Sequence, residues 1–208
     1  GIDLDYMLGL VFYAKNPEDN YMSHNGRVHA WTTLERALTF RLRDSFVRSQ
    51  EPREADYLTG APSGQLLPGT QRERATYLRN VLEPSIEYRF GAENLFAINY
   101  RNNIYQTERS TSEDSQENFL SPILTYWFDI RNGLTFEYGY TIADFERSPD
   151  FDGHLARARY SHRFNPKTLV FVEHFYLIRN FDFPGTDYDV QNPGMGIEHA
   201  FSPTLSGR

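Results

Sequence analysis

A long hairpin with two unlike faces occupies the middle of the chain, over residues 78–105. In both halves, apolar or aromatic side chains alternate with charged or polar ones. The apolar set is Leu78, Leu82, Ile86, Tyr88 and Phe90, then Phe96, Ile98, Tyr100 and Ile104, and the polar set includes Arg79, Glu83, Glu87 and Arg89, then Asn99, Arg101 and Asn103. The polar stretch at residues 91–94 lies between the two halves. A period of two sustained over ~10 residues predicts two strands, each with one apolar and one polar face.

The same unit recurs along the chain at a nearly fixed interval. An aromatic residue stands directly before a short polar turn at Phe90, Phe128, Phe164 and Phe201, at spacings of 38, 36 and 37 residues. A fixed interval indicates a repeated supersecondary unit. The interval fits two strands of about twelve residues with one turn and one loop, and such a strand reaches ~40 Å, enough to cross a ~25 Å apolar band at a tilt. Propeller blades and soluble sandwiches use shorter strands.

The alternation predicts about ten strands in all. Besides the central hairpin, they cover residues 1–14, 21–33, 37–48, 119–128, 134–145, 154–164, 169–179 and 190–201, and residues 205–208 begin another. A helix is the rival interpretation for residues 34–46. The orientation of 169–179 is ambiguous unless Glu173 and Arg179 share its polar face. Pro122 lacks a backbone N–H, so we expect a bulge or a local break there.

Short turns and longer polar segments alternate between these strands. The longer ones are residues 15–20, 50–74, 107–118, 146–153 and 180–189. The stretch 50–74 contains three prolines and three glycines and is the longest of these. It could be a domain linker, but the same alternation on both sides favours a loop within one domain. Short turns at one end and long loops at the other are typical of membrane barrels.

Composition limits the remaining classes. The chain has 208 residues, no cysteine and a net charge of -7. We expect one domain over residues 1–208, incomplete at its C-terminus. The absence of cysteine excludes disulfides and thiolate metal sites, and the acidic balance argues against nucleic acid as a partner. A mean hydropathy of -0.61 excludes a helical membrane protein. It does not exclude a barrel, in which only every second residue of a strand is apolar.

Alternation alone does not decide whether the apolar face meets lipid or packs inside a soluble barrel or sandwich. Three features favour lipid. The strands are long, aromatic residues cluster at strand ends beside the turns as interfacial girdles do, and the apolar face carries many tyrosines, which are costly in a dry core. We therefore predict an all-β fold, an antiparallel up-and-down transmembrane β-barrel in the bacterial outer membrane, in contact with its lipid and lipopolysaccharide.

Two tracts, residues 82–90 (Leu-Glu-Pro-Ser-Ile-Glu-Tyr-Arg-Phe) and 156–166 (Ala-Arg-Ala-Arg-Tyr-Ser-His-Arg-Phe-Asn-Pro), carry a family resemblance. In these tracts and in overall pattern, the chain resembles the Gram-negative outer-membrane β-barrel porin 2 family. The resemblance implies a component of exopolysaccharide export and a larger barrel than this chain. The chain departs from outer-membrane barrels in lacking a terminal aromatic residue, since it ends at Ser206-Gly207-Arg208.

The charged faces supply the candidate functional residues. Those predicted to line a lumen and the substrate path are Arg41, Arg43, Arg79, Arg89, Arg101, Arg157, Arg159, Arg163, Glu83, Glu87 and Glu137. Arginine-rich walls attract anionic solutes or acidic sugars, and the Arg157, Arg159 and Arg163 run is the best candidate for selectivity. Any single arginine could instead belong to an ion-pair network that fills a narrow lumen.

We therefore predict a channel that passes or helps export a polar or anionic solute or a polysaccharide. The alternative is a non-transporting structural, adhesive or assembly barrel, with the loop at residues 50–74 as the candidate site for a protein partner. His162 and His174 fall on the predicted lipid face, without a nucleophile–base–acid arrangement. We predict no enzymatic activity, no cofactor and no metal.

Overall fold

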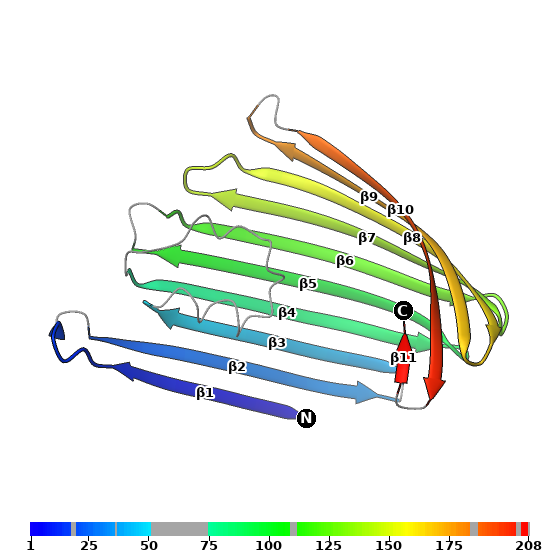
Figure 1. Cartoon of the computed structure of the whole chain (residues 1–208), viewed down its shortest axis with the longest axis horizontal. Helices are drawn as coiled ribbons and strands as arrows, with labels where there is room; N and C mark the ends of the chain where they lie inside the picture. Colours follow the sequence, from blue (N-terminus) through cyan, green and yellow to red (C-terminus); the bar gives the residue numbers. More distant parts are fainter. Residues whose placement is uncertain are drawn as a thin grey trace.

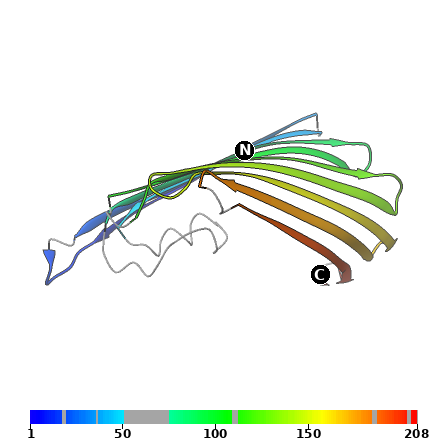
Figure 2. The same ribbon diagram turned by 90° about the horizontal axis from the view of Figure 1, so that it is seen from above.

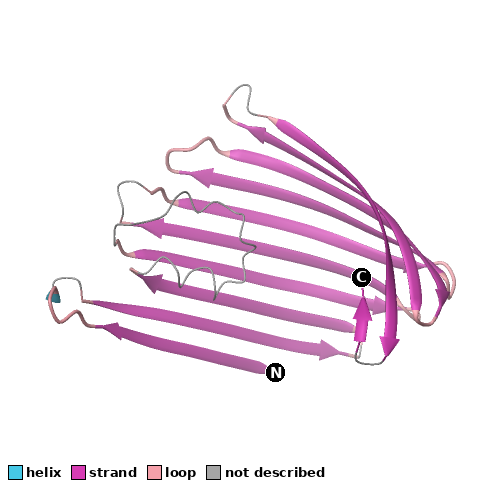
Figure 3. Ribbon diagram, in the orientation of Figure 1, coloured by secondary structure: helices cyan, strands magenta, loops and turns pink. Residues whose placement is uncertain are grey.

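The chain forms one large antiparallel sheet in the computed structural model (Figures 1 and 3). The structure describes residues 1–17, 20–35, 37–50, 75–108, 112–183, 187–202 and 205–207. The loop predicted at residues 50–74 lies, beyond Gln50, outside the described residues. Within the described ranges, no helix has the length and apolarity needed to cross a membrane.

The described residues form eleven strands, which follow one another in the sheet. They are β1 (Ile2–Val11), β2 (Tyr21–Leu34), β3 (Leu38–Ser49), β4 (Tyr77–Phe90), β5 (Asn94–Thr107), β6 (Ser115–Trp127), β7 (Asn132–Phe145), β8 (Phe151–Asn165), β9 (Thr168–Phe181), β10 (Tyr188–Ser202) and the short β11 (Leu205–Gly207). Their order in the sheet is their order in the sequence, and each strand pairs antiparallel with the next.

The sheet is curved and does not close on itself: β1 lies at one edge, while β10 and β11 lie at the other (Figures 1 and 2). Short turns join the strands at one end, for example residues 91–93 and 166–167, and longer segments join them at the other. These ends are called the turn end and the loop end below. The predicted up-and-down topology and its asymmetry are therefore confirmed.

Local sequence explains the hairpins. Gly91 is the first residue of the β4–β5 turn, and its φ of +62° lies in the left-handed region, which residues with a side chain rarely adopt. Residues 38–49 form a strand, so the helical alternative for 34–46 is wrong, because alternate apolar residues there pair with β2 and β4 on one face. Glu173 and Arg179 share a face of β9, which resolves the orientation of that strand.

The polar loops were predicted too long at three places. β6 begins at Ser115 instead of residue 119, β8 begins at Phe151, and β9 and β10 extend into the predicted loop at 180–189. Polar composition was the reason for those predictions. The residues nevertheless continue the backbone ladder, as in the pair Asn102–Asn118, because a strand that has left an apolar environment can keep pairing with polar side chains on both faces.

Two prolines interrupt the ladder without shifting its register. Pro122 has no paired residue on β7, and neither has Ser121, although the pairs on either side keep the same register. Pro84 produces the same gap toward β5. The local break expected at Pro122 is thus present without a bulge, because proline removes only the donor of one ladder bond.

Burial is concentrated on one face and not between layers. In the described part of the chain, the buried cluster consists of Val47 and Tyr77 with Tyr105 packed against them, all on the same face near the loop end. The other face carries large exposed apolar residues over most of the sheet. A sheet with a large exposed apolar face is stable in an apolar medium, where that face is not in contact with water.

Candidate functional site

The strand register divides the sheet into two chemically distinct faces. The eleven residues predicted to line a lumen all lie on one face, here called the inner face: Arg41, Arg43, Arg79, Glu83, Glu87, Arg89, Arg101, Glu137, Arg157, Arg159 and Arg163. The opposite, outer face carries the alternating apolar residues. The structure therefore brings the predicted set onto one side of a single sheet, although β3 and β8 are far apart in it.

The outer face is apolar and open in its middle. Ile86, Phe96 and Ile98 are 42%, 40% and 37% exposed, whereas inner-face Arg79 is 8% exposed. A soluble barrel would bury the first three and expose the arginine. The observed distribution fits a sheet whose apolar side meets lipid acyl chains.

Aromatic residues mark the turn end of this face. Phe128, Phe164 and Phe201 are each about 60% exposed. Phe164 packs edge-on against His162, with ring centroids 4.7 Å apart, and Phe201 packs in the same way against His199. Rings with one polar neighbour suit the membrane–water interface.

The loop end of the outer face is polar, and its side chains bond to one another. The Asn80 amide donates to Asp44 (2.7 Å), and the Tyr100 hydroxyl donates to Asn118 (2.7 Å). The Tyr138 hydroxyl lies 2.6 Å from Nδ1 of His154. This polar collar ends the apolar band before the strands end, so the strands extend beyond the band at the loop end.

Ion pairs join neighbouring strands on the inner face of β7–β10. Glu173 of β9 accepts hydrogen bonds from Arg157 (2.8 Å) and Arg159 (3.0 Å) of β8. Arg159 also lies 3.6 Å from Glu198, and its guanidinium stacks 4.0 Å from the centre of the Phe171 ring. The arginines proposed for selectivity are therefore largely engaged with carboxylates.

The inner face of β3–β6 is paired less completely. Glu87 binds both Arg41 and Arg89 at 2.8 Å, and Arg101 binds Glu117 at 2.5 Å. Arg43 and Glu83 face each other across β3 and β4 as register partners. Within the described residues, neither makes an ion pair or hydrogen bond. Sequence reasoning missed Glu117 because it lay in a predicted loop.

One ion pair crosses several strands and shows which way the sheet curves. Arg163 of β8 binds both carboxylate oxygens of Glu93, in the β4–β5 turn, at 3.0 and 2.7 Å. The same guanidinium lies 4.3 Å from the centre of the Trp127 ring of β6. Such a contact needs side chains that converge over β5–β7, so the inner face is concave at the turn end. The Arg163 guanidinium holds the pKa of Glu93 below its usual value.

A carboxylate also ties two segments together at the loop end. Glu113 accepts hydrogen bonds from the backbone N–H groups of Arg147 (2.9 Å) and Ser148 (2.7 Å) and from the Ser148 hydroxyl. Partial burial raises the pKa of Glu113, but these hydrogen bonds outweigh burial, and the net shift is downward. The contact joins Glu113 to the segment of residues 146–150.

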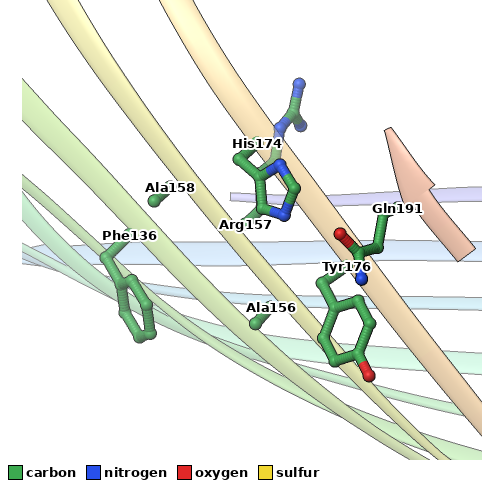
Figure 4. A pocket seen from close by; sticks show the side chains of 7 residues that line it. All are labelled: Phe136, Ala156, Arg157, Ala158, His174, Tyr176 and Gln191. Carbon is green, nitrogen blue, oxygen red and sulfur yellow. The ribbon is translucent and has the colours of Figure 1, made fainter. Parts of the chain in front are cut away.

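Each face has a hollow of about 340 Å³. On the outer face, Ala156 lies between the rings of Phe136 and Tyr176, and Ala158 lies between Phe136 and His174 (Figure 4). On the inner face, the hollow lies beside the ladder gap at Pro84. It is lined by Arg41, Arg43, Glu83, Pro84, Ser85, Asn99, Tyr100, Arg101 and Phe119.

The described residues hold no group of three His, Cys, Asp or Glu side chains that could bind a metal. His162 and His174 lie on the outer face, as expected from the sequence. His162 contacts Asn132 at 2.8 Å, beside the turn end. The expectations of no enzymatic activity, no cofactor and no metal stay predictions.

Known proteins match the chain by structure. Outer-membrane OmpT of Vibrio cholerae superposes with a TM-score of 0.61 at 19% identity, over 93% of this chain and 60% of that chain. A loop L8 deletion mutant of the same protein gives 0.62 at 18% identity, over 95% and 61%. The chain has the fold of outer-membrane β-barrels. No protein-family model and no curated protein matches it, so the resemblance to the β-barrel porin 2 family stays a prediction.

The fold agrees with a location in the bacterial outer membrane, as the apolar outer face does. An outer-membrane protein contacts lipid and lipopolysaccharide. The chain spans about 61% of the length of the solved structures that it matches.

Proposed function

We propose that the chain forms the wall of an outer-membrane channel that passes, or helps to export, a polar solute or an exopolysaccharide. The inner face is the wall of the path, and the outer face is anchored in lipid. A channel needs an apolar exterior and a polar, charged interior.

One observation supports this proposal: the eleven charged residues predicted to line a lumen, from β3, β4, β5, β7 and β8, lie on the concave side of a sheet whose convex side is apolar in its middle. The ion pairs there come from different strands, as in Arg157–Glu173 and Arg41–Glu87. An arginine engaged by a carboxylate attracts a passing anion less strongly. Arg43 has no ion-pair partner among the described residues, so it is a stronger candidate for selectivity than the run from Arg157 to Arg163.

Conductance in planar bilayers tests the channel. We expect steady conductance with a reversal potential that depends on charge at Arg43. Arg43→Glu should shift the ion preference toward cations. Arg48→Glu makes the same charge change on the outer face of the same strand and should leave the preference unchanged. A sealed protein, or equal shifts for both variants, would overturn the proposal.

A non-transporting barrel is the second candidate, and the inner-face ion pairs favour it. Arginines held by Glu87, Glu117 and Glu173 could fill and stiffen a closed interior. In that case no variant of the inner face would conduct. The same bilayer measurement separates the two functions.

A further inference from the structure

We propose that the inner face between β3 and β6 carries a binding subsite for an acidic sugar, with Arg43 as the group that recognises its carboxylate. This inference rests on the proposed channel function, because it names a solute class for the same wall. It identifies the inner-face hollow as the place where that solute is held.

The hollow lies beside an interruption in the β4–β5 ladder. Pro84 has no N–H, and the pairs Glu83–Arg101 and Pro84–Tyr100 are missing from the β4–β5 ladder. Its volume of about 340 Å³ is at the lower end of the ~300–1,000 Å³ typical of ligand sites. One sugar residue is a suitable occupant.

The three arginines at the hollow differ in whether a carboxylate of the protein binds them. Arg41 is paired with Glu87, and Arg101 with Glu117. Arg43 is exposed and, within the described part of the chain, has no ion-pair or hydrogen-bond partner, although Glu83 is its register neighbour. A guanidinium in this state can bind a ligand carboxylate through two parallel hydrogen bonds without first breaking an internal pair.

The remaining lining suits the rest of a sugar. Glu83 can accept hydrogen bonds from hydroxyl groups, and Ser85 and Asn99 can both donate and accept them. Phe119 offers an aromatic surface for the apolar C–H face of a pyranose ring. The guanidinium of Arg101 lies 5.7 Å from the centre of the Phe119 ring. An uncharged sugar would lack the contact with Arg43, and a simple inorganic anion would lack the contact with Phe119.

Equilibrium binding to the protein in detergent micelles tests the subsite without requiring conduction. The probes are trigalacturonate and its uncharged methyl ester, measured by titration calorimetry at low salt. We expect trigalacturonate to bind at least about tenfold more tightly than the ester, since a charge-assisted hydrogen bond contributes at least that factor. Arg43→Gln should abolish this preference.

Two further variants distinguish specific binding at the subsite from a general electrostatic attraction between the protein and an anion. Arg48→Gln removes an exposed arginine from the same strand as Arg43 but on the outer face, outside the hollow, and it should leave binding within about twofold. Phe119→Leu should weaken the acid and the ester alike. Equal losses for Arg43→Gln and Arg48→Gln, or equal binding of acid and ester, would overturn the subsite.

The two proposals fail differently. Binding that depends on Arg43 in a protein that does not conduct would retain the subsite and overturn the channel. Conductance without measurable binding of trigalacturonate would do the reverse.

Discussion

The two faces of the same strands are held in place by different interactions. In the middle of the outer face, Ile86 and Ile98 stand as exposed register partners. One residue along on the inner face, side chains are joined by ion pairs such as Arg41–Glu87. The outer face thus depends on the surrounding medium, and the inner face depends on specific partners. Substitutions on the two faces should therefore fail for different reasons.

The largest expected effect is a charge on the outer face. Ile98→Arg should destabilise the protein in lipid vesicles by about 2–4 kcal/mol, because the guanidinium would lie among acyl chains. Asn99→Arg, one residue away on the inner face, should cost no more than about 1 kcal/mol. Urea unfolding followed by tryptophan fluorescence gives both values. Equal costs would contradict the assignment of the faces.

A smaller effect should distinguish paired from unpaired arginines within the inner face. Arg159→Gln removes contacts with Glu173, Glu198 and the Phe171 ring, and it should cost about 1–3 kcal/mol of unfolding free energy. Arg43→Gln should change stability by less than about 0.5 kcal/mol, since it breaks no pair with any residue that the structure describes. The reverse order would show that Arg43 has a structural role.

The smallest expected effect is a pH dependence of the unfolding free energy that comes from the Glu93–Arg163 pair. Arg163 lowers the pKa of Glu93 in the folded protein. The stabilisation by this pair is therefore fully present above the pKa that Glu93 has in the unfolded chain, and it is lost as the pH falls through the lower pKa of the folded protein. Because the pair is partly exposed, we expect less than about 1 kcal/mol. Glu93→Gln should remove this part of the acid sensitivity of unfolding. An unchanged profile would contradict the pairing.

Much of the architecture could be predicted from sequence because it is local. Alternation over residues 78–105 fixes both strands and both faces, and the interval between Phe90 and Phe128 fixes the repeat. Polar strand ends such as residues 115–118 could not be recognised, because outside an apolar band the side chains of a strand resemble those of a loop.

The partners of the arginines could not be predicted either. The Arg163–Glu93 pair depends on how far each strand is staggered against the next, and that offset accumulates over β4–β8. Alternation identifies the face of a residue but not its neighbour on that face. The distinction between engaged Arg159 and available Arg43 therefore required the structure.

Each hairpin of the sheet makes its contacts mainly with the hairpins directly before and after it. Because the described strands share no central core that requires all of them to fit one another at once, a copy of the ~37-residue unit could be gained or lost in evolution without redesign of the others. The width of a barrel in such a lineage would then change by one hairpin at a time, while each remaining hairpin keeps its own side chains.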